Sequence, residues 1–436
     1  MKIILDPESG FLTEDKKKYD VRKALLNAGV KAGVCFKPGE VTPEVVRETE
    51  TEEQRLKRGL DTIFSEHTSP SEQPQVSLEI VGIPKIMCMV LNNEQQYNAD
   101  ERSLRYTAVK PNDYISEEET TLYNKWLEIF INLLNKEYLD FFKRFNQGDT
   151  EEKTNKKTQS AIKKIAQENA RYMVSVFMPT TLTYTVPFAQ INKICLYMER
   201  IINKPLNEFE ELLVPYFKEF IHSLKDLDVA LTNNKVKEIF PNIKNVPDNN
   251  ELTYTNNKQT ELSLFSERNK FSGINLPNEY GVTFSYNMEL SLASYAQFHR
   301  HRTTNFEIEV PKLSEEKFYI PLLLDGKEEL IKEWLKDIKS VNKYYPQGKI
   351  IRANANGSLK RLVQYVGKER ACDRAFLETE DLFTNEMLPG IYEGLLASGK
   401  IELAETLKPY VGKLRCMYPD YKCPGVCGHP RIRRKF

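Results

Sequence analysis

The segment Ser116–Phe142, SEEETTLYNKWLEIFINLLNKEYLDFF, decides the fold class. Ser116 and Glu119 have the spacing of a capping box, in which each side chain satisfies a backbone N–H group at the start of a helix. The apolar residues that follow recur at helical spacing, and they are Leu122, Trp126, Ile129, Phe130, Leu133, Tyr138, Phe141 and Phe142. The segment is therefore predicted to be a long amphipathic helix.

A second segment, from Lys327 to about Tyr345, has the same character, and each of the two segments contains one of the two tryptophans of the chain. An apolar stretch with strand character precedes each helix: Val76–Leu91 in the first half and Val282–Ala296 in the second. Each half is predicted to be strand-rich and then helical, which indicates an internal repeat at domain scale. The expected fold is α/β (α+β), with a mixed or antiparallel sheet and long helices in each of two copies. The apolar face of the second helix is formed by Leu330, Trp334, Leu335, Ile338 and Val341.

Two polar stretches interrupt this pattern. Leu231–Thr260 is rich in Asn, Lys and Pro, as linkers and long surface connections are. We therefore place a domain boundary near 245, with residues 1–245 as the first unit and 246–436 as the second. Asn146–Ser160, NQGDTEEKTNKKTQS, is too polar to bury, and we expect a mobile loop there.

The charge of the chain is balanced, with 62 Lys and Arg against 62 Asp and Glu. Nucleic-acid binding needs a broad basic face, so neither nucleic acid nor a membrane surface is an expected partner. The N-terminal MKIILDPESG lacks the apolar core of a signal peptide, and the most apolar stretch, Ile80–Leu91, is too short to span a bilayer. The seven cysteines do not resemble a disulfide framework, so we expect a cytoplasmic protein.

The densest cluster of chemically useful side chains is Phe298–Phe306, FHRHRTTNF. Its guanidinium groups can hold phosphate oxygens through paired hydrogen bonds, and its imidazoles can stack on a planar ring or bond to it. A solvated basic surface loop has the same composition. The cluster therefore indicates either a site for a phosphate-bearing planar ligand or a plain surface loop.

The first half contains two smaller clusters. Asp100–Tyr106, DERSLRY, supplies a hydroxyl, two guanidiniums and a phenol, and Glu168–Tyr172, ENARY, precedes the Thr-rich stretch Met173–Val186. A helix predicted over Ile191–Ile202 carries Arg200. Each arginine alone is more often part of a surface ion pair, so only their combination indicates a site.

That combination resembles the motifs of the flavin-dependent thymidylate synthases. Arg300-His301-Arg302 is similar to the RHR signature of the family, and Ser103-Leu104-Arg105-Tyr106 is similar to the SxRY sequence that normally closes the same motif. The two parts lie in different halves, because the RHR position of the first half falls on Asn93-Glu94-Gln95 and the serine position of the second falls on Val310. The offset between the RHR positions, 300 minus 93, is 207, and that between the tryptophans, 334 minus 126, is 208. This agreement favours a duplication.

Other stretches follow the order of the family. His67–Gln73 is similar to its GHxSxxEH segment, without the glycine and with glutamine in place of the last histidine. Asn169–Tyr172 is similar to DARYVLP, and Leu196–Arg200 to HFxxLR. In the second half Glu369–Ala375 is similar to ELRxxxRAQ. The resemblance thus extends thinly over most of the chain.

The resemblance implies a function and a set of site residues. Members of the family methylate dUMP at C5, with FAD as cofactor and methylene-tetrahydrofolate and NADPH as cosubstrates. By analogy, Arg200 or Arg370 faces the uracil ring as a catalytic residue. The implied FAD contacts are Ser69, Arg300, His301, Arg302 and Thr303. The implied contacts to a dUMP-like nucleotide are Ser103, Arg105, Tyr106 and Arg171.

Family members are tetramers with active sites shared between subunits, so the resemblance implies a homodimer of this chain that mimics the tetramer. Because complementary motifs are missing from the two halves, our hypothesis is a composite site in which the first half binds the nucleotide and the second half the flavin. The reciprocal sites are then dead. Pro187 and Gln190 stand where the family has the asparagine and arginine of TxNxRxL. Transfer of another C5 group, and a catalytically dead nucleotide-binding scaffold, therefore stay open.

The C-terminal tail contains a possible zinc cluster. Cys416, Cys423, Cys427 and His429 are close enough in sequence to ligate zinc. Their spacing is not that of a standard zinc knuckle, and we expect no metal.

Overall fold

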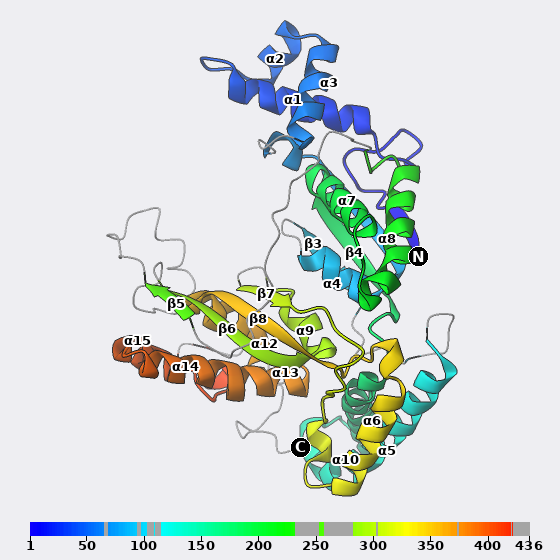
Figure 1. Cartoon of the computed structure of the whole chain (residues 1–436), viewed down its shortest axis with the longest axis vertical. Coiled ribbons are helices and arrows are strands. Elements are labelled where there is room, and N and C mark those ends of the chain that lie inside the picture. Colours follow the sequence, from blue (N-terminus) through cyan, green and yellow to red (C-terminus); the bar gives the residue numbers. More distant parts are fainter. Residues whose placement is uncertain are drawn as a thin grey trace. The chain divides into compact units, whose positions relative to one another are not determined.

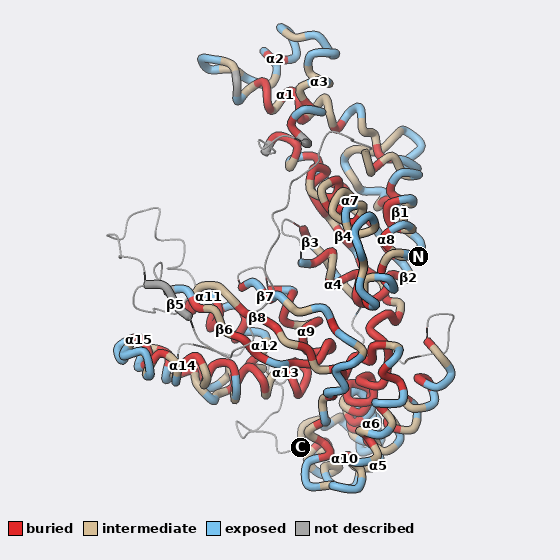
Figure 2. The backbone as a smooth tube through the Cα atoms, in the orientation of Figure 1, coloured by how far each residue is buried: buried red, intermediate tan, exposed pale blue. Residues whose placement is uncertain are grey.

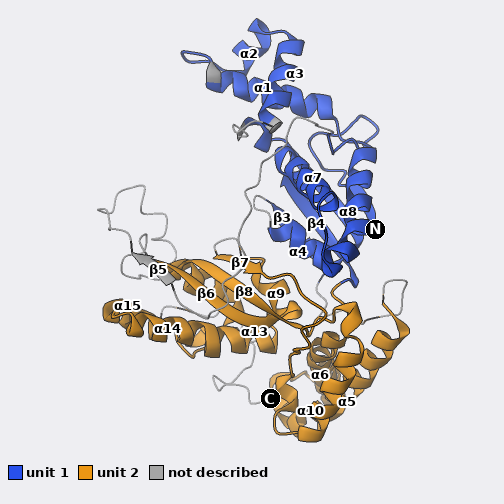
Figure 3. Cartoon of the chain, in the orientation of Figure 1, with its two compact units in different colours: residues 1–102, 177–243 blue, residues 103–176, 244–436 orange. Residues whose placement is uncertain are grey.

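The computed structural model describes residues 1–64, 69–93, 97–102, 109, 115–231, 253–256, 282–301, 304–372, 375–419 and 421. The chain forms two compact units (Figure 3): unit 1 contains residues 1–102 and 177–243, and unit 2 contains residues 103–176 and 244–436. Both combine helices with an antiparallel sheet, which confirms the predicted fold class at that level. The boundary near 245 concerns the proposed repeat and stays a prediction.

The sheet of unit 1 has the strand order β1-β2-β4-β3. Buried residues alternate with more exposed ones along most of its central strands, β2 and β4, so one face of these strands is buried in the core. Helices α7 and α8 belong to the same unit, and α7 confirms the predicted helix over 191–202. The bounds are β1 Lys2–Leu5, β2 Gln75–Pro84, β3 Asn98–Glu101, β4 Pro179–Pro187, α7 Phe188–Ile202 and α8 Glu208–Asp226.

The strand expected over Val76–Leu91 ends at Pro84, and helix α4, Lys85–Asn93, follows at once. Nearly every residue of this helix is buried, so its apolar run shows no helical periodicity. Its Met and Leu residues are good helix formers, which explains the local choice. The same change occurs in the second half, where the strand ends at Ser291.

Three further helices of unit 1 pack through glycine contacts: α1 (Val21–Phe36), α2 (Pro43–Thr49) and α3 (Glu52–Phe64). A Cβ atom on Gly59 would lie 2.0 Å from the carbonyl oxygen of Leu25, and one on Gly29 would lie 1.9 Å from that of Arg55. Only glycine lets the two backbones approach this closely.

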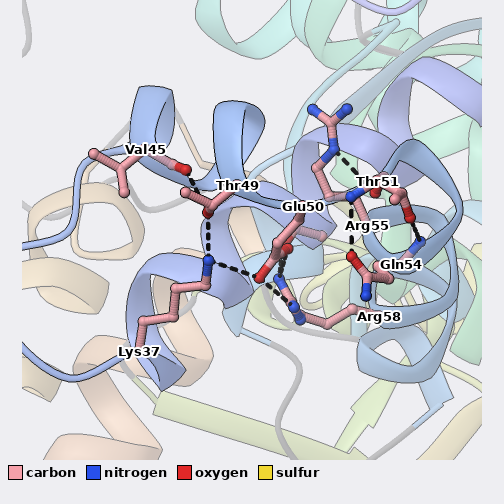
Figure 4. A network of polar contacts seen from close by, with 9 residues as sticks. Lys37, Val45, Thr49, Glu50, Thr51, Gln54, Arg55 and Arg58 are labelled. Carbon is pink, nitrogen blue, oxygen red and sulfur yellow. Dashed lines mark hydrogen bonds and ion pairs between the residues drawn. The ribbon is translucent and has the colours of Figure 1, made fainter.

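An ion-pair network joins the same helices (Figure 4). Both terminal nitrogens of Arg58 donate to the carboxylate of Glu50 at 2.7 Å, and Lys37 Nζ lies 3.1 Å from it. The side chain of Glu50 is only 8% exposed, and its bonds to Arg58 lower the pKa of the carboxyl group. The network therefore fixes α2 and its flanking turn against α1 and α3.

Replacing Gly59 by Ala is expected to destabilise this helical segment by at least about 2 kcal/mol, because the added methyl group meets backbone that cannot rotate away. Hydrogen–deuterium exchange of α1 and α3 measures the effect. Gly10→Ala is the matched control, since no atom lies within 4 Å of the added Cβ. Equal protection in both variants would contradict the close helix contact.

The sheet of unit 2 has the order β5-β6-β8-β7 (Figure 1). Figure 2 shows the buried stretches of β6 and β8, where Leu290, Ala353 and Ala355 are at most 1% exposed. Short helical segments follow β6 and β8, and α13 and α14 lie along the sheet. The bounds are β5 Thr253–Asn256, β6 Val282–Ser291, β7 Thr304–Ile308, β8 Ile350–Ser358, α9 Leu292–Phe298, α11 Leu359–Arg361, α12 Gly367–Arg370, α13 Leu377–Asp381, α14 Leu388–Ala397 and α15 Ile401–Leu407.

Unit 2 also contains the predicted long helices, α5 (Glu117–Phe145) and α10 (Glu328–Ser340). The capping box of Ser116 and Glu119 is present as expected. The rings of Trp126 and Trp334 meet edge to face, 4.9 Å apart, and both are fully buried. The two tryptophans therefore form the centre of this helical core.

The mobile loop expected over Asn146–Ser160 is wrong, because helix α6, Glu151–Ala170, begins inside it. Thr150 caps the helix by accepting a bond from the backbone N–H of Lys153. Most polar residues between Glu151 and Ser160 are exposed, while Ile162 and Ala166 are fully buried. The polar sequence of this stretch is that of a helix with one exposed side rather than that of a loop.

The two sheets have the same strand order, and several of their elements begin at constant offsets in residue number. Strand β6 begins 207 residues after β2, and α9 begins 207 after α4. Strand β8 begins 171 after β4, and α11 begins 171 after α7. The strand register obeys both offsets, since Asn98 pairs with Thr185 and Asn305 pairs with Asn356.

Two backbone segments of unit 2 that lie at the 171-residue offset bond to each other. The N–H of Val176 donates to the carbonyl of Tyr345 at 2.9 Å. The N–H of Gln347 donates to the carbonyl of Val174 at 2.8 Å. By the 171-residue offset, Tyr345 corresponds to Val174 and Gln347 to Val176, so the two bonds exchange partners as they do across a two-fold axis.

Among the described residues, no helix has both the length and the apolar character that crossing a bilayer requires.

Candidate active site

The predicted site residues fall into three groups. Ser69, at the start of the short helix Ser69–Glu72, and Arg200, exposed on α7, belong to unit 1. Unit 2 contains Arg171, Arg300, His301 and Arg370. Outside the described residues lie Ser103, Arg105, Tyr106, Arg302 and Thr303, together with Cys423, Cys427 and His429 of the tail.

His301 and Arg370 form a bonded pair in unit 2. Arg370 Nε donates to His301 Nε2 at 2.8 Å. Gln297 holds the same guanidinium through its side-chain oxygen, 3.2 Å from Nη1, and its backbone carbonyl, 2.7 Å from Nη2. Helix α9 carries Gln297 and leads into His301, whereas Arg370 ends α12, so the pair connects two elements.

His301 is buried beside positive charge. Burial first, and then the charge of Arg370, lower the pKa of the imidazole well below its ordinary value. His299 and Arg300 act in the same direction. The ring is therefore neutral at physiological pH, while the neighbouring Arg300 side chain is exposed and remains charged.

Arg171 approaches this pair through an aromatic residue. It lies at the end of α6 and is 3% exposed, with its guanidinium carbon 4.8 Å from the ring centre of Phe376. The N–H of Phe376 is 3.4 Å from the side-chain oxygen of Gln297, a long hydrogen bond. The contacts of Gln297 thus join the arginine from the first half to the His301–Arg370 pair from the second.

The carboxyl group of Glu378 is buried and bonds to residues close in sequence to Arg171 and Gln297. Glu378 accepts bonds from the backbone N–H of Ser291 at 2.8 Å, from the Ser291 hydroxyl at 2.5 Å and from the Tyr172 hydroxyl at 2.9 Å. Burial raises the pKa of Glu378 to about 7, although these bonds oppose the shift. Glu378 therefore connects the residue after Arg171 to Ser291, the cap of the helix that carries Gln297.

The residues that sequence reasoning missed are Gln297, Phe376 and Glu378. Gln297 directly precedes the cluster Phe298–Phe306, so its proximity to that motif was a usable signal. Phe376 and Glu378 lie just beyond the stretch Glu369–Ala375, and their partners are distant in sequence. No local pattern identifies them.

The arrangement is suited to an anionic ligand with a planar group. A guanidinium stacked on an aromatic ring, a neutral imidazole and an exposed guanidinium can supply charge, hydrogen bonds and stacking together. These groups are suited to binding a ligand and polarising it.

Comparison with known proteins bears on the first half of the chain. Residues 27–213 match the family model Thy1, thymidylate synthase complementing protein. The match includes Arg171, strands β2 to β4 and helices α5 to α7. No curated protein gives a significant match to the chain. Residues 27–213 are thus similar to the thymidylate synthase complementing proteins, in agreement with the resemblance that the motifs of this half indicated.

Proposed function

We propose that the chain is a flavin-dependent thymidylate synthase-like transferase that methylates dUMP to dTMP, using FAD, methylene-tetrahydrofolate and NADPH. The observation that carries this proposal is the contact path from Arg171 through Phe376 and Gln297 to Arg370 and His301. It joins the motif of the first half that is proposed to bind the nucleotide to the motif of the second half that is proposed to bind the flavin. The Thy1 match over residues 27–213 supports the reaction class.

The two-copy architecture is part of the proposal. It is supported by the equal strand order, by the offsets of 207 and 171 residues and by the exchanged bonds of Val174 and Val176 with Tyr345 and Gln347. In this interpretation unit 2 contains the seam between two copies, which a homodimer of single-copy chains would form between subunits. A homodimer of the fused chain would then correspond to the family tetramer.

One composite site per chain is the proposed arrangement. By the 171-residue offset the counterpart of Arg171 is Asn342. The side-chain oxygen of Asn342 accepts a bond from Lys349 Nζ at 2.8 Å, and Lys349 is fully buried. An amide engaged by a buried lysine cannot replace a phosphate-binding arginine, which supports the loss of the reciprocal site.

In this proposal the side chains of the protein bind and orient the nucleotide and the flavin. Arg171, with Ser103, Arg105 and Tyr106, is proposed to hold the nucleotide phosphate and sugar. Arg300 and His301, with Ser69, Arg302 and Thr303, are proposed to hold FAD. When bound, reduced flavin would supply the hydride and the folate the carbon, so the protein needs to position and polarise the pyrimidine. The proposed location is the cytoplasm.

Separate titrations of FAD and dUMP test the composite site. Arg300→Ala is expected to weaken FAD binding about tenfold or more and leave dUMP binding nearly unchanged, whereas Arg171→Ala is expected to do the reverse, because each removes one charge-assisted bond. Flavin absorbance and isothermal titration calorimetry with dUMP are the readouts. Lys317→Ala, which removes an exposed ion pair of unit 2, is the control.

The outcomes also separate the alternative functions. Equal loss of both ligands in both variants would contradict the division between the halves. Failure of the wild-type chain to bind FAD at all would leave a nucleotide-binding scaffold. Dependence of flavin reoxidation on dUMP without dTMP formation would indicate transfer of a different group to C5.

A further inference from the structure

The bond between Arg370 and His301 constrains where the imidazole proton lies. We infer that Arg370 is a positioning residue that holds His301 neutral with its proton on Nδ1, so that His301 presents a hydrogen-bond donor to an acceptor oxygen of a bound ligand. The ligand's identity, a phosphate-bearing flavin, rests on the proposed function. The tautomer does not, since it follows from the chain alone.

The argument starts from the chemistry of the guanidinium. Arginine keeps its proton in proteins, and each of its nitrogens can only donate hydrogen bonds. Arg370 Nε lies 2.8 Å from His301 Nε2, so Nε2 has to be the acceptor. A neutral imidazole carries one proton, which is then on Nδ1.

The surroundings keep the ring in that state. His301 is 8% exposed, and its burial and the adjacent positive charges lower the pKa of the imidazole. The charged or titratable groups that act on it are Arg370 from α12 and Arg300 and His299 from its own segment, and each disfavours a second proton. Protonation would also place two N–H groups against each other along the bond to Arg370.

Gln297 holds the guanidinium group of Arg370 in place, so the position of Nε relative to the imidazole of His301 is fixed. Nη1 and Nη2 of Arg370 donate to Gln297, on α9, while Nε donates to His301. With these three nitrogens engaged inside the protein, Arg370 acts through His301 rather than on the uracil ring that the resemblance suggested. Nδ1–H is the donor that His301 retains for a ligand.

Nitrogen-15 NMR of histidine-labelled protein without ligand tests the tautomer. The two-bond coupling pattern of His301, assigned by its loss in His301→Asn, is expected to be that of the Nδ1–H form and to persist as pH falls from 7.5 to 6. Exposed His222 gives the internal reference. Arg370→Ala is expected to yield a tautomer mixture that gains a proton over this interval, whereas Arg352→Ala, which removes an ion pair with Glu309 in the same unit, should change nothing.

Arg370→Lys separates positioning from folding. A lysine nitrogen can also only donate, so partial return of the Nδ1–H pattern is expected if the donor is what matters. A wild-type Nε2–H pattern, or an unchanged Nδ1–H pattern in Arg370→Ala with His301 still folded and buried, would overturn the inference.

FAD titration tests the consequence for the ligand separately. Asparagine places its amide N–H close to the position of Nδ1, whereas glutamine reaches toward the position of Nε2. His301→Asn is therefore expected to keep FAD affinity within about threefold of wild type, and His301→Gln to lose about five- to tenfold, the value of one net hydrogen bond. Equal losses would refute the donor role of Nδ1. Absence of FAD binding by the wild type would refute the proposed function and leave the NMR result standing.

Discussion

Trp334→Ala is expected to lower the free energy of unfolding of unit 2 by about 3–5 kcal/mol. The ring is fully buried, and it meets Trp126 at 4.9 Å and Phe130 at 5.8 Å. Its indole N–H donates to the carbonyl of Tyr319 at 2.8 Å, so truncation also leaves a buried acceptor without that donor. Urea unfolding followed by circular dichroism measures the change.

Two variants bracket this result. Trp334→Phe retains most of the side-chain volume, so it should lower the free energy of unfolding by less than half as much as Trp334→Ala does. Tyr365→Ala removes an aromatic ring that is 44% exposed in the same unit, and it should cost less than about 1 kcal/mol. A cost for Trp334→Ala no larger than that of Tyr365→Ala would show that α5 and α10 do not share a core.

Glu378 is expected to make unit 2 more stable as the pH falls from about 7 to about 4.5. The folded-state pKa of about 7 is above the ordinary value of 4.5, so below 4.5 both states are protonated and no penalty exists. Between these values the unfolded state ionises while the folded state does not, and above 7 the full cost of burying the carboxylate is present. A shift of this size corresponds to about 3 kcal/mol.

The contribution is measured as the difference between wild type and Glu378→Gln at each pH. A difference is needed because His301 acts in the opposite direction: its lowered pKa means that stability is lost as the unfolded imidazole gains a proton. Glu378→Gln should be the more stable protein above pH 7, and its advantage should disappear toward pH 4.5. Glu402→Gln, on an exposed position of α15, is the control. A difference independent of pH would show that Glu378 is not buried as a carboxylate.

Periodicity was sufficient where a helix or strand has one buried face. It predicted α5, α7 and α10, and the spacing of Ser116 and Glu119 predicted a helix start that the structure contains. It failed for α4, which is buried on nearly all sides, and for α6, whose long polar face concealed a helix that packs along α5. In both, tertiary packing decides what the local pattern leaves ambiguous.

In the candidate site, too, some residues could be identified from the sequence and others could not. The arginines and His301 were visible because they stand in recognisable motifs. Gln297 and Glu378 were not, since they act through bonds to residues 73 and 87 positions away. Arg370 was among the candidate residues, but its bond to His301 could not be inferred from the sequence. Supporting residues of this kind are defined by the fold rather than by a motif.

Unit 2 is built from two separate stretches of the chain, residues 103–176 and 244–436, and this constrains the order in which the chain can fold during synthesis. Helices α5 and α6 are made early, yet their unit also requires residues after 244, including α10 with Trp334. The apolar face around Trp126 therefore lacks its contact with Trp334 until about 200 further residues have left the ribosome. Unit 1, by contrast, is complete once residue 243 has emerged. A chain that ended before residue 244 would thus leave the apolar face around Trp126 without the helix that covers it.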